Sequence, residues 1–162
     1  MSERIETTAI RNLIHNEEYC RKVLPFIKEE YFTDRLEKLI FTEIYQFVNK
    51  YNNLPTKESL SIEMNTNKSI SEDEFKRMNE IISSLNPEPI NLDWLVETTE
   101  VWCKDRAIHN AILGGIQILD GKDKDHTPEY LPELLSEALS VSFDQKVGHD
   151  YLLESKERYE YY

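Results

Sequence analysis

The apolar residues of this chain recur mainly at spacings of three and four, which is the period of an α-helix. The longest such run covers residues 93–119, and we expect it to form one extended amphipathic helix. After a short loop, a second apolar stripe runs through residues 131–139. Two amphipathic helices joined by a short loop predict a long helical hairpin over residues 91–143.

Residues 1–90 carry shorter apolar stripes, each separated from the next by a start or stop signal for a helix. Residues that can cap a helix through their side chains are Asn16, Asp34, Thr56, Ser71 and Asn91. A glutamate follows Asp34 and Ser71 by three residues, which is the spacing of a capping box. No stretch alternates with the two-residue period of a strand, so the predicted fold class is all-α: a small helical bundle followed by a long helical hairpin.

Charge and hydropathy limit the classes of function. The 31 acidic and 19 basic residues give a formal net charge of −12, which repels a nucleic-acid backbone, so we do not expect tight binding of duplex DNA. No segment approaches the ~18 apolar residues that a membrane span needs, and the charged N-terminus is unlike a signal peptide. Two distant cysteines suit reduced thiols. These features predict a soluble intracellular protein without membrane contact.

Motifs for catalysis or for cofactor binding are not apparent. The glycine-rich phosphate loops of nucleotide-binding proteins are absent, and the four histidines share no metal-ligand spacing with each other or with the cysteines. No nucleophile stands beside a candidate base. We therefore predict no catalytic, cofactor-binding or metal site in this chain.

The glycine pair Gly114–Gly115 lies inside the long predicted helix, where each glycine costs about 1 kcal/mol relative to alanine. One interpretation is a point at which another helix approaches closely. The other is a tolerated weak spot near the tip of the hairpin.

The predicted hairpin has more apolar surface than one neighbouring helix can cover, and we expect copies of the same chain to cover it. The alternative is that the long helix packs back on its own bundle as an ordinary core element. The residues expected to contact another copy are Val101, Ile108, Ile112, Ile116, Leu119, Leu134, Leu135, Ala138 and Leu139.

Several segments resemble a known family. The array Tyr31–Phe32, Ile40–Phe41, Pro55–Thr56 and Leu60 resembles the globular N-terminal part of DnaB-like replicative helicases. More specific is the segment ALSVSFDQKVGHD at 138–150, which looks like the N-terminal domain of the DnaB-like replicative DNA helicases of T-even-type phages. The resemblance extends over nearly the whole chain.

The resemblance implies a helical bundle followed by a hairpin, as in that family. There the hairpins pair, and the N-terminal domains form a collar, often a trimer of dimers, above a hexameric ring of RecA-like ATPase domains. That ring unwinds the replication fork 5′ to 3′ with ATP and magnesium, and the collar helps to dock the primase. A helicase loader and a single-strand-binding protein are further implied partners, in the cytoplasm of an infected bacterial host.

The resemblance also implies that this chain is part of a longer helicase, because it contains no ATPase motif. Residues 144–162 occupy the place of the linker helix that leads to the ATPase domain, which would make most of the DNA contacts. The competing hypothesis is a free-standing helical adaptor or helicase loader that binds single-stranded DNA. That function needs a basic groove lined with aromatic residues. The chain supplies Trp94, Trp102 and tyrosines, but little neighbouring positive charge.

Overall fold

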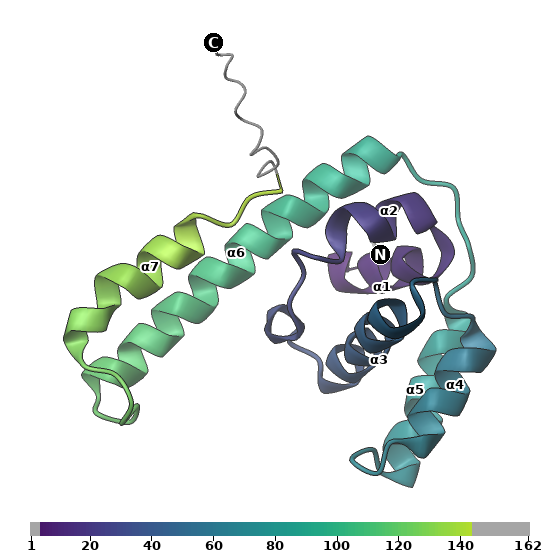
Figure 1. The fold of residues 1–162 in the computed structure, drawn as a ribbon, viewed down its shortest axis with the longest axis horizontal. Coiled ribbons are helices and arrows are strands. Elements are labelled where there is room, and N and C mark those ends of the chain that lie inside the picture. The colour runs from purple at the N-terminus through teal and green to yellow at the C-terminus, as the bar shows by residue number, and fades with distance from the viewer. Residues whose placement is uncertain (1–3, 144–162) are drawn as a thin grey trace. The chain divides into compact units, whose positions relative to one another are not determined.

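A computed structural model describes residues 4–143 of the chain, and within this range it contains seven α-helices, two short 3₁₀-helices and no strand (Figure 1). The prediction of an all-α fold is confirmed. The elements are α1 (Ile5–His15), α2 (Glu17–Val23), η1 (Glu29–Tyr31), α3 (Arg35–Tyr51), α4 (Lys57–Thr66), α5 (Glu72–Ser84), α6 (Leu92–Leu119), η2 (Pro128–Tyr130) and α7 (Leu131–Leu139).

The chain divides into two compact units, and the division falls inside α6, between Thr99 and Glu100. The sequence pattern predicts that the bundle ends near residue 90. The first turns of α6 belong to the first unit, because Leu95 and Thr99 are fully buried there and the Tyr19 hydroxyl lies 2.7 Å from the Thr99 hydroxyl. The expected linker helix at 144–162 lies outside the described residues.

The helices begin where side chains can satisfy their free backbone N–H groups. Asn16 accepts a hydrogen bond from the Tyr19 N–H at 3.0 Å, and Asn91 accepts one from the Trp94 N–H at 2.9 Å. Complete capping boxes open α4 at Thr56 and α5 at Ser71. At α2, α4, α5 and α6, the N-cap residues predicted from the sequence are therefore the ones that cap the helix.

The expected capping box of α3 is only half formed, so this prediction was wrong in part. Asp34 accepts the Glu37 N–H at 3.1 Å, as expected. The Glu37 carboxylate does not return to the backbone of Asp34, because it accepts hydrogen bonds from Arg4 at 2.7 Å and Thr7 at 2.8 Å. Glu37 thus joins α3 to the N-terminal end of α1.

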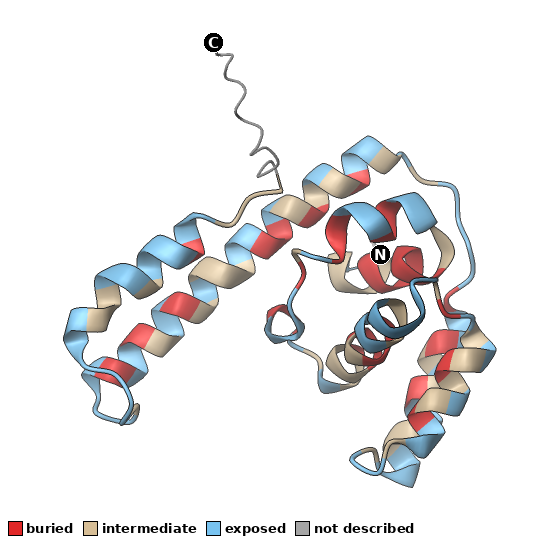
Figure 2. Ribbon diagram, viewed as in Figure 1, coloured by how far each residue is buried: buried red, intermediate tan, exposed pale blue. Residues whose placement is uncertain are grey.

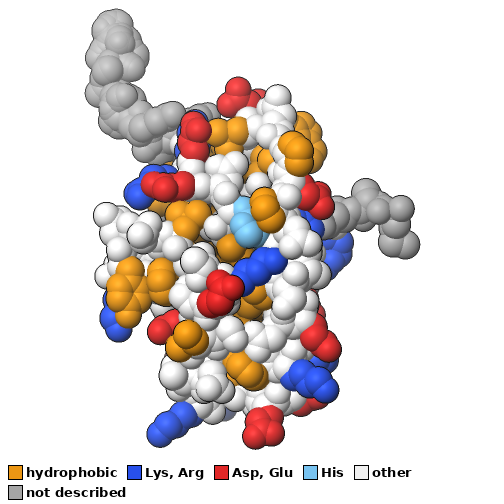
Figure 3. All heavy atoms as spheres, turned by 90° about the vertical axis from the view of Figure 1, so that its right-hand side faces the viewer, with side chains coloured by type: hydrophobic (Ala, Val, Ile, Leu, Met, Phe, Trp, Pro, Cys, Tyr) orange, Lys and Arg blue, Asp and Glu red, His pale blue; other side chains and the backbone are white. Residues whose placement is uncertain are grey.

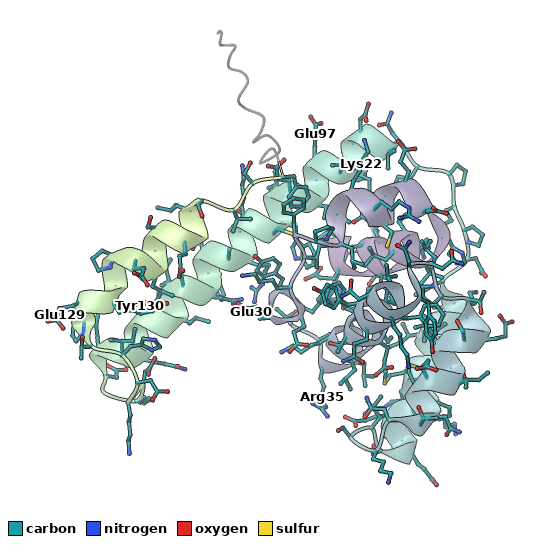
Figure 4. The ribbon with its side chains drawn as sticks, viewed as in Figure 1. Lys22, Glu30, Arg35, Glu97, Glu129 and Tyr130 are labelled. Atoms are coloured by element: carbon teal, nitrogen blue, oxygen red, sulfur yellow. The ribbon has the colours of Figure 1, made fainter. Side chains whose placement is uncertain are left out.

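The core of the first unit lies where α3 packs against α1 on one side and against α4 and α5 on the other. Polar contacts between distant segments surround this core. Arg35, at the start of α3 (Figure 4), donates a hydrogen bond to the Glu74 carboxylate at 2.6 Å. His15 Nε2 lies 2.7 Å from the Leu85 carbonyl oxygen. The side of the molecule seen in Figure 3 shows apolar side chains in small groups among charged ones. The fully buried large side chains of this unit include Ile10, Leu13, Tyr19, Tyr31, Phe32, Ile40, Ile44, Leu60, Met64, Met78, Ile82 and Leu85.

In the second unit, α7 returns antiparallel beside α6 (Figure 1). Gly121, at φ 76°, ends α6 in a left-handed conformation that glycine adopts without strain, and the Lys122 N–H then donates to the Gln117 carbonyl at 2.9 Å. The rings of His126 and Tyr130 stack with centroids 4.3 Å apart where the tip loop enters α7. No helix among residues 4–143 is long and apolar enough to cross a membrane.

Candidate self-association surface

One stripe of α6 packs against α7 and forms the inner contact of the hairpin, which we call the hairpin seam. Its members are Ala111, Gly114, Gly115 and Ile118 on α6 and Leu131, Leu134 and Ala138 on α7. A Cβ atom at Gly115 would stand 3.1 Å from Leu131 Cδ2, and one at Gly114 would stand 3.7 Å from Leu134 Cδ2. The absence of a side chain at Gly115 lets α7 approach closely, which favours the first of the two interpretations of the glycine pair.

A second stripe of the hairpin is not covered within the second unit. Of the residues expected to contact another copy, six have exposed fractions between 41% and 69%. Figure 2 shows exposed positions along both helices, interspersed on α6 with buried ones. We call this surface the apolar face. It consists of Val101, Ile112, Ile116 and Leu119 on α6, Leu135 and Leu139 on α7, and the half-buried Ile108.

The two helices present the apolar face on the same side of the hairpin. On α6, exposed Ile112 directly follows buried Ala111, and exposed Leu119 directly follows buried Ile118; on α7, Leu139 follows Ala138 in the same way. Each step rotates the side chain by about 100° in the same sense along its own helix. Because the helices are antiparallel, equal rotations away from the shared seam point both stripes toward the same side.

Two of the nine expected contact residues lie elsewhere. Leu134 and Ala138 belong to the hairpin seam, so they are covered by the same chain and lie off the apolar face. Sequence periodicity alone did not separate them from Leu135 and Leu139, since all four fall within one broad apolar stripe. Whether a second copy covers the apolar face remains a prediction.

Two features of the hairpin surface were not predicted. Leu113 is 48% exposed but lies about 100° beyond Ile112, away from the apolar face. Asp105 is exposed and falls, by its helical position, between Val101 and Ile112 on the apolar face. A carboxylate therefore interrupts an otherwise apolar stripe, which constrains how two such faces can meet.

The Glu100 carboxylate contacts the segment that follows α7. Glu100 accepts a hydrogen bond from the Phe143 N–H at 3.1 Å and lies 3.6 Å from Lys104 Nζ. This contact ties the segment after α7 to the first turn of α6 in the second unit.

No group of three or more histidine, cysteine or acidic residues within 4–143 could hold a metal ion. The two thiols are buried, and this burial raises the pKa of Cys20 to about 11 and that of Cys103 to about 12. Thiols that stay protonated at neutral pH are poor nucleophiles and poor metal ligands. The described residues thus place no reactive thiol on the surface of either unit.

The aromatic residues offer little for stacking on nucleic-acid bases. Trp94 is 53% exposed, but Trp102 is only 7% exposed, so it cannot stack on a base without a rearrangement. This placement weakens the hypothesis of a single-stranded DNA adaptor.

Comparison with known proteins identifies a relative. No protein-family model matches the chain. Over 158 residues, the chain is 32% identical to the DnaB-like replicative helicase of Enterobacteria phage T4. The match covers 93% of this chain but only 33% of that protein, in its N-terminal region. The chain is thus homologous to about one third of the phage protein.

Proposed function

We propose that this homologue of a DnaB-like replicative helicase acts as the oligomerisation and primase-docking domain, or collar, of a hexameric 5′–3′ helicase at the replication fork. The observation that carries the proposal is the apolar face on a hairpin homologous to the N-terminal part of such a helicase. In this proposal, ATP and magnesium are bound by a RecA-like domain outside this chain.

The apolar face provides the free energy for self-association. Burying one Ile or Leu side chain contributes about 1.5–3 kcal/mol, and six residues of the face are well exposed. Two hairpins that cover each other's faces would form a four-helix bundle, a common way to bury such stripes. Three such pairs would give the trimer of dimers expected for a collar.

The direct test replaces two exposed residues of the face, Ile112→Asp with Ile116→Asp. Both side chains are about half exposed, so the hairpin should remain helical by circular dichroism while the charges prevent association. Leu113→Asp is the control, because it adds one carboxylate, as each of the two substitutions does, to an exposed position of the same helix off the face. Light scattering should show that only the double variant is monomeric. An oligomer that survives in the double variant would contradict the proposed surface.

Primase docking is supported by the resemblance to the helicase family rather than by a particular pocket. We expect the primase encoded with this chain to bind the unmodified chain, as measured by titration calorimetry. We also expect it to bind the monomeric double variant more weakly if docking requires the paired collar. A helicase loader and a single-strand-binding protein are further candidates for the same titration. Failure of the primase to bind the assembled chain would contradict the docking role and leave the oligomerisation role standing.

The excess of acidic residues supports a collar that organises proteins while DNA is held by other domains. The net charge of −12 opposes accumulation of DNA around this chain. Fluorescence anisotropy with labelled single-stranded DNA should therefore show negligible binding, even at low salt. Tight binding that weakens steeply with salt would instead favour the adaptor or loader hypothesis.

A further inference from the structure

A groove runs along one side of α3 in the first unit. Its larger part is a cavity of about 460 Å³ between α3 and the segment that follows α2, and its smaller part is a cavity of about 190 Å³ between α2 and the end of α3. Pro25 lines both cavities, so we describe them together as the α3 groove. The apolar residues that line it are Leu24, Pro25, Ile27, Phe41, Tyr45 and Val48.

The larger cavity suits an aromatic or large aliphatic side chain. The Tyr45 side chain is 41% exposed, and its ring is supported by the Phe41 ring, with centroids 6.0 Å apart. The segment after α2 supplies Pro25 and Ile27 to the same cavity. A ring that enters this cavity would bury apolar surface against Tyr45 and Pro25.

Side-chain amides line both parts of the α3 groove. Gln46 lines the larger cavity, and Asn49 and Asn53 line the smaller one. All three residues are exposed, and within residues 4–143 none of their side-chain amides makes a hydrogen bond. A primary amide offers a donor and an acceptor together, as does the N–H and C=O of a peptide unit. The amides therefore match the free main chain of an extended peptide, whereas a helix uses its own N–H and C=O groups internally.

The charges that line the α3 groove favour an acidic residue in such a peptide. Lys28 is exposed at the larger cavity and forms no ion pair with any other described residue. The Glu29 carboxylate accepts a hydrogen bond from the Thr42 hydroxyl at 2.8 Å. Arg21, at the smaller cavity, is paired with Glu17 at 2.8 Å. Lys28 is thus the lining cation left to meet an anion, and one cation is too few for a nucleic-acid strand, which needs several phosphate contacts.

We propose that the α3 groove binds an extended peptide segment of a partner protein, with an aromatic or large aliphatic residue in the larger cavity and an aspartate or glutamate beside Lys28. From Phe41 to Asn49, α3 advances about 12 Å at 1.5 Å per residue. That distance equals the length of about four residues of an extended chain at 3.3 Å each. The ligand is therefore a short linear motif. The groove lies wholly within the first unit, so its occupancy does not depend on self-association through the hairpin.

A displayed library of random short peptides is the probe. Peptides would be selected on the full chain, and an enriched peptide would be labelled and its dissociation constant measured by fluorescence anisotropy. We expect the enriched sequences to share a large apolar residue and an aspartate or glutamate a few positions away. Selection that yields no common motif, or a motif without an acidic residue, would overturn the proposal.

The amides are tested by Gln46→Ala with Asn49→Ala. This variant should raise the dissociation constant of the enriched peptide about tenfold, because it removes hydrogen bonds to the peptide main chain. Asn65→Ala is the control, since it removes an exposed amide from α4 that does not line the groove. Both variants alter exposed positions, so both should keep the circular dichroism of the unmodified chain. Unchanged binding by the double variant would contradict the role of the amides in the groove.

The charge is tested by Lys28→Glu, which should weaken binding several-fold because it opposes the acidic residue of the peptide. Lys50→Glu is the matched control. It makes the same change in charge at an exposed position of α3 that lines neither cavity. Equal weakening by the two variants would mean that net charge alone governs binding, and would overturn the proposal. Displacement of the peptide by an unlabelled single-stranded oligonucleotide would also overturn it, since the groove would then accept nucleic acid.

Discussion

The two units of this chain differ in how they cover their apolar side chains. In the first unit, large residues such as Ile40 and Tyr19 are fully buried among several helices. In the hairpin, the hairpin seam is covered, but Ile112, Ile116 and Leu119 remain about half exposed or more. A bundle can close a core on all sides, whereas two antiparallel helices have one mutual contact and leave the other faces uncovered. The first unit therefore closes its own core, whereas the hairpin leaves an apolar stripe exposed, which we propose that a second copy covers.

The largest expected effect is the difference in unfolding free energy between replacing a buried isoleucine and replacing an exposed one. Ile40→Ala should lower the free energy of unfolding by about 2–5 kcal/mol, because it leaves a cavity in the buried core. Ile116→Ala should change the stability of the monomer by less than about 0.5 kcal/mol, since surface substitutions away from packed sites have small effects. Urea denaturation at concentrations below the dimer dissociation constant measures both. Similar losses in the two variants would mean that the apolar face is already packed within one chain.

A smaller effect is expected where α6 joins the first unit. Thr99→Val removes the buried hydrogen bond to the Tyr19 hydroxyl, and we expect a loss of about 0.5–1.5 kcal/mol. Thr98→Val is the control, because Thr98 is only half-buried and lies beside Thr99 on the same turn. Thermal unfolding of the two variants gives the comparison. If the control lost as much stability, the Tyr19–Thr99 contact would not be what holds the start of α6.

Alanine substitutions at Gly114 and Gly115 test how closely α7 packs against α6 in the hairpin seam. Gly114→Ala should stabilise the chain by up to about 1 kcal/mol, because alanine favours the helix and its Cβ would make ordinary contact with Leu134. Gly115→Ala should give no such gain, since its Cβ would crowd Leu131 at 3.1 Å. Chemical denaturation of both variants decides the point. An equal gain at the two positions would show that α7 does not approach closely at Gly115.

The smallest expected effect is on the pH dependence of the stability of the first unit. The hydrogen bond from Arg35 lowers the pKa of Glu74, so this carboxylate stabilises the fold above its ordinary pKa and loses that contribution as pH falls through the lowered value. Acid unfolding monitored by circular dichroism should therefore be less steep for Glu74→Gln than for the unmodified chain. Glu72→Gln, in the same turn of α5, is the control. Equal acid sensitivity in all three proteins would contradict the role of the Arg35 contact.

Local signals made much of the fold predictable from the sequence. N-cap side chains act on amides two or three residues away, so Asn16, Thr56, Ser71 and Asn91 mark the starts of their helices without information from the rest of the chain. Contacts between distant residues were not predictable in this way. Glu37 is diverted from its capping box by Arg4, and the division of α6 follows from the contact of Thr99 with Tyr19, 80 residues apart in sequence.

The candidate surface was predictable only in outline. The apolar stripes of α6 and α7 predicted a hairpin with excess apolar surface. They did not show which residue of each adjacent pair, such as Ala138 and Leu139, faces inward. That choice depends on the close approach of α7 at Gly115, which is a property of the packed pair of helices. The apolar pattern carries no information on Asp105, because a carboxylate is not part of a hydrophobic stripe.

The most direct test of the central claim is the mass of the unmodified chain in solution. Sedimentation velocity would be measured from low to high micromolar concentrations. We predict a concentration-dependent shift from monomer to dimer or to a larger even-numbered assembly. A chain that remains monomeric at high micromolar concentration, with the apolar face shown to be protected inside that monomer by hydrogen exchange, would contradict the account.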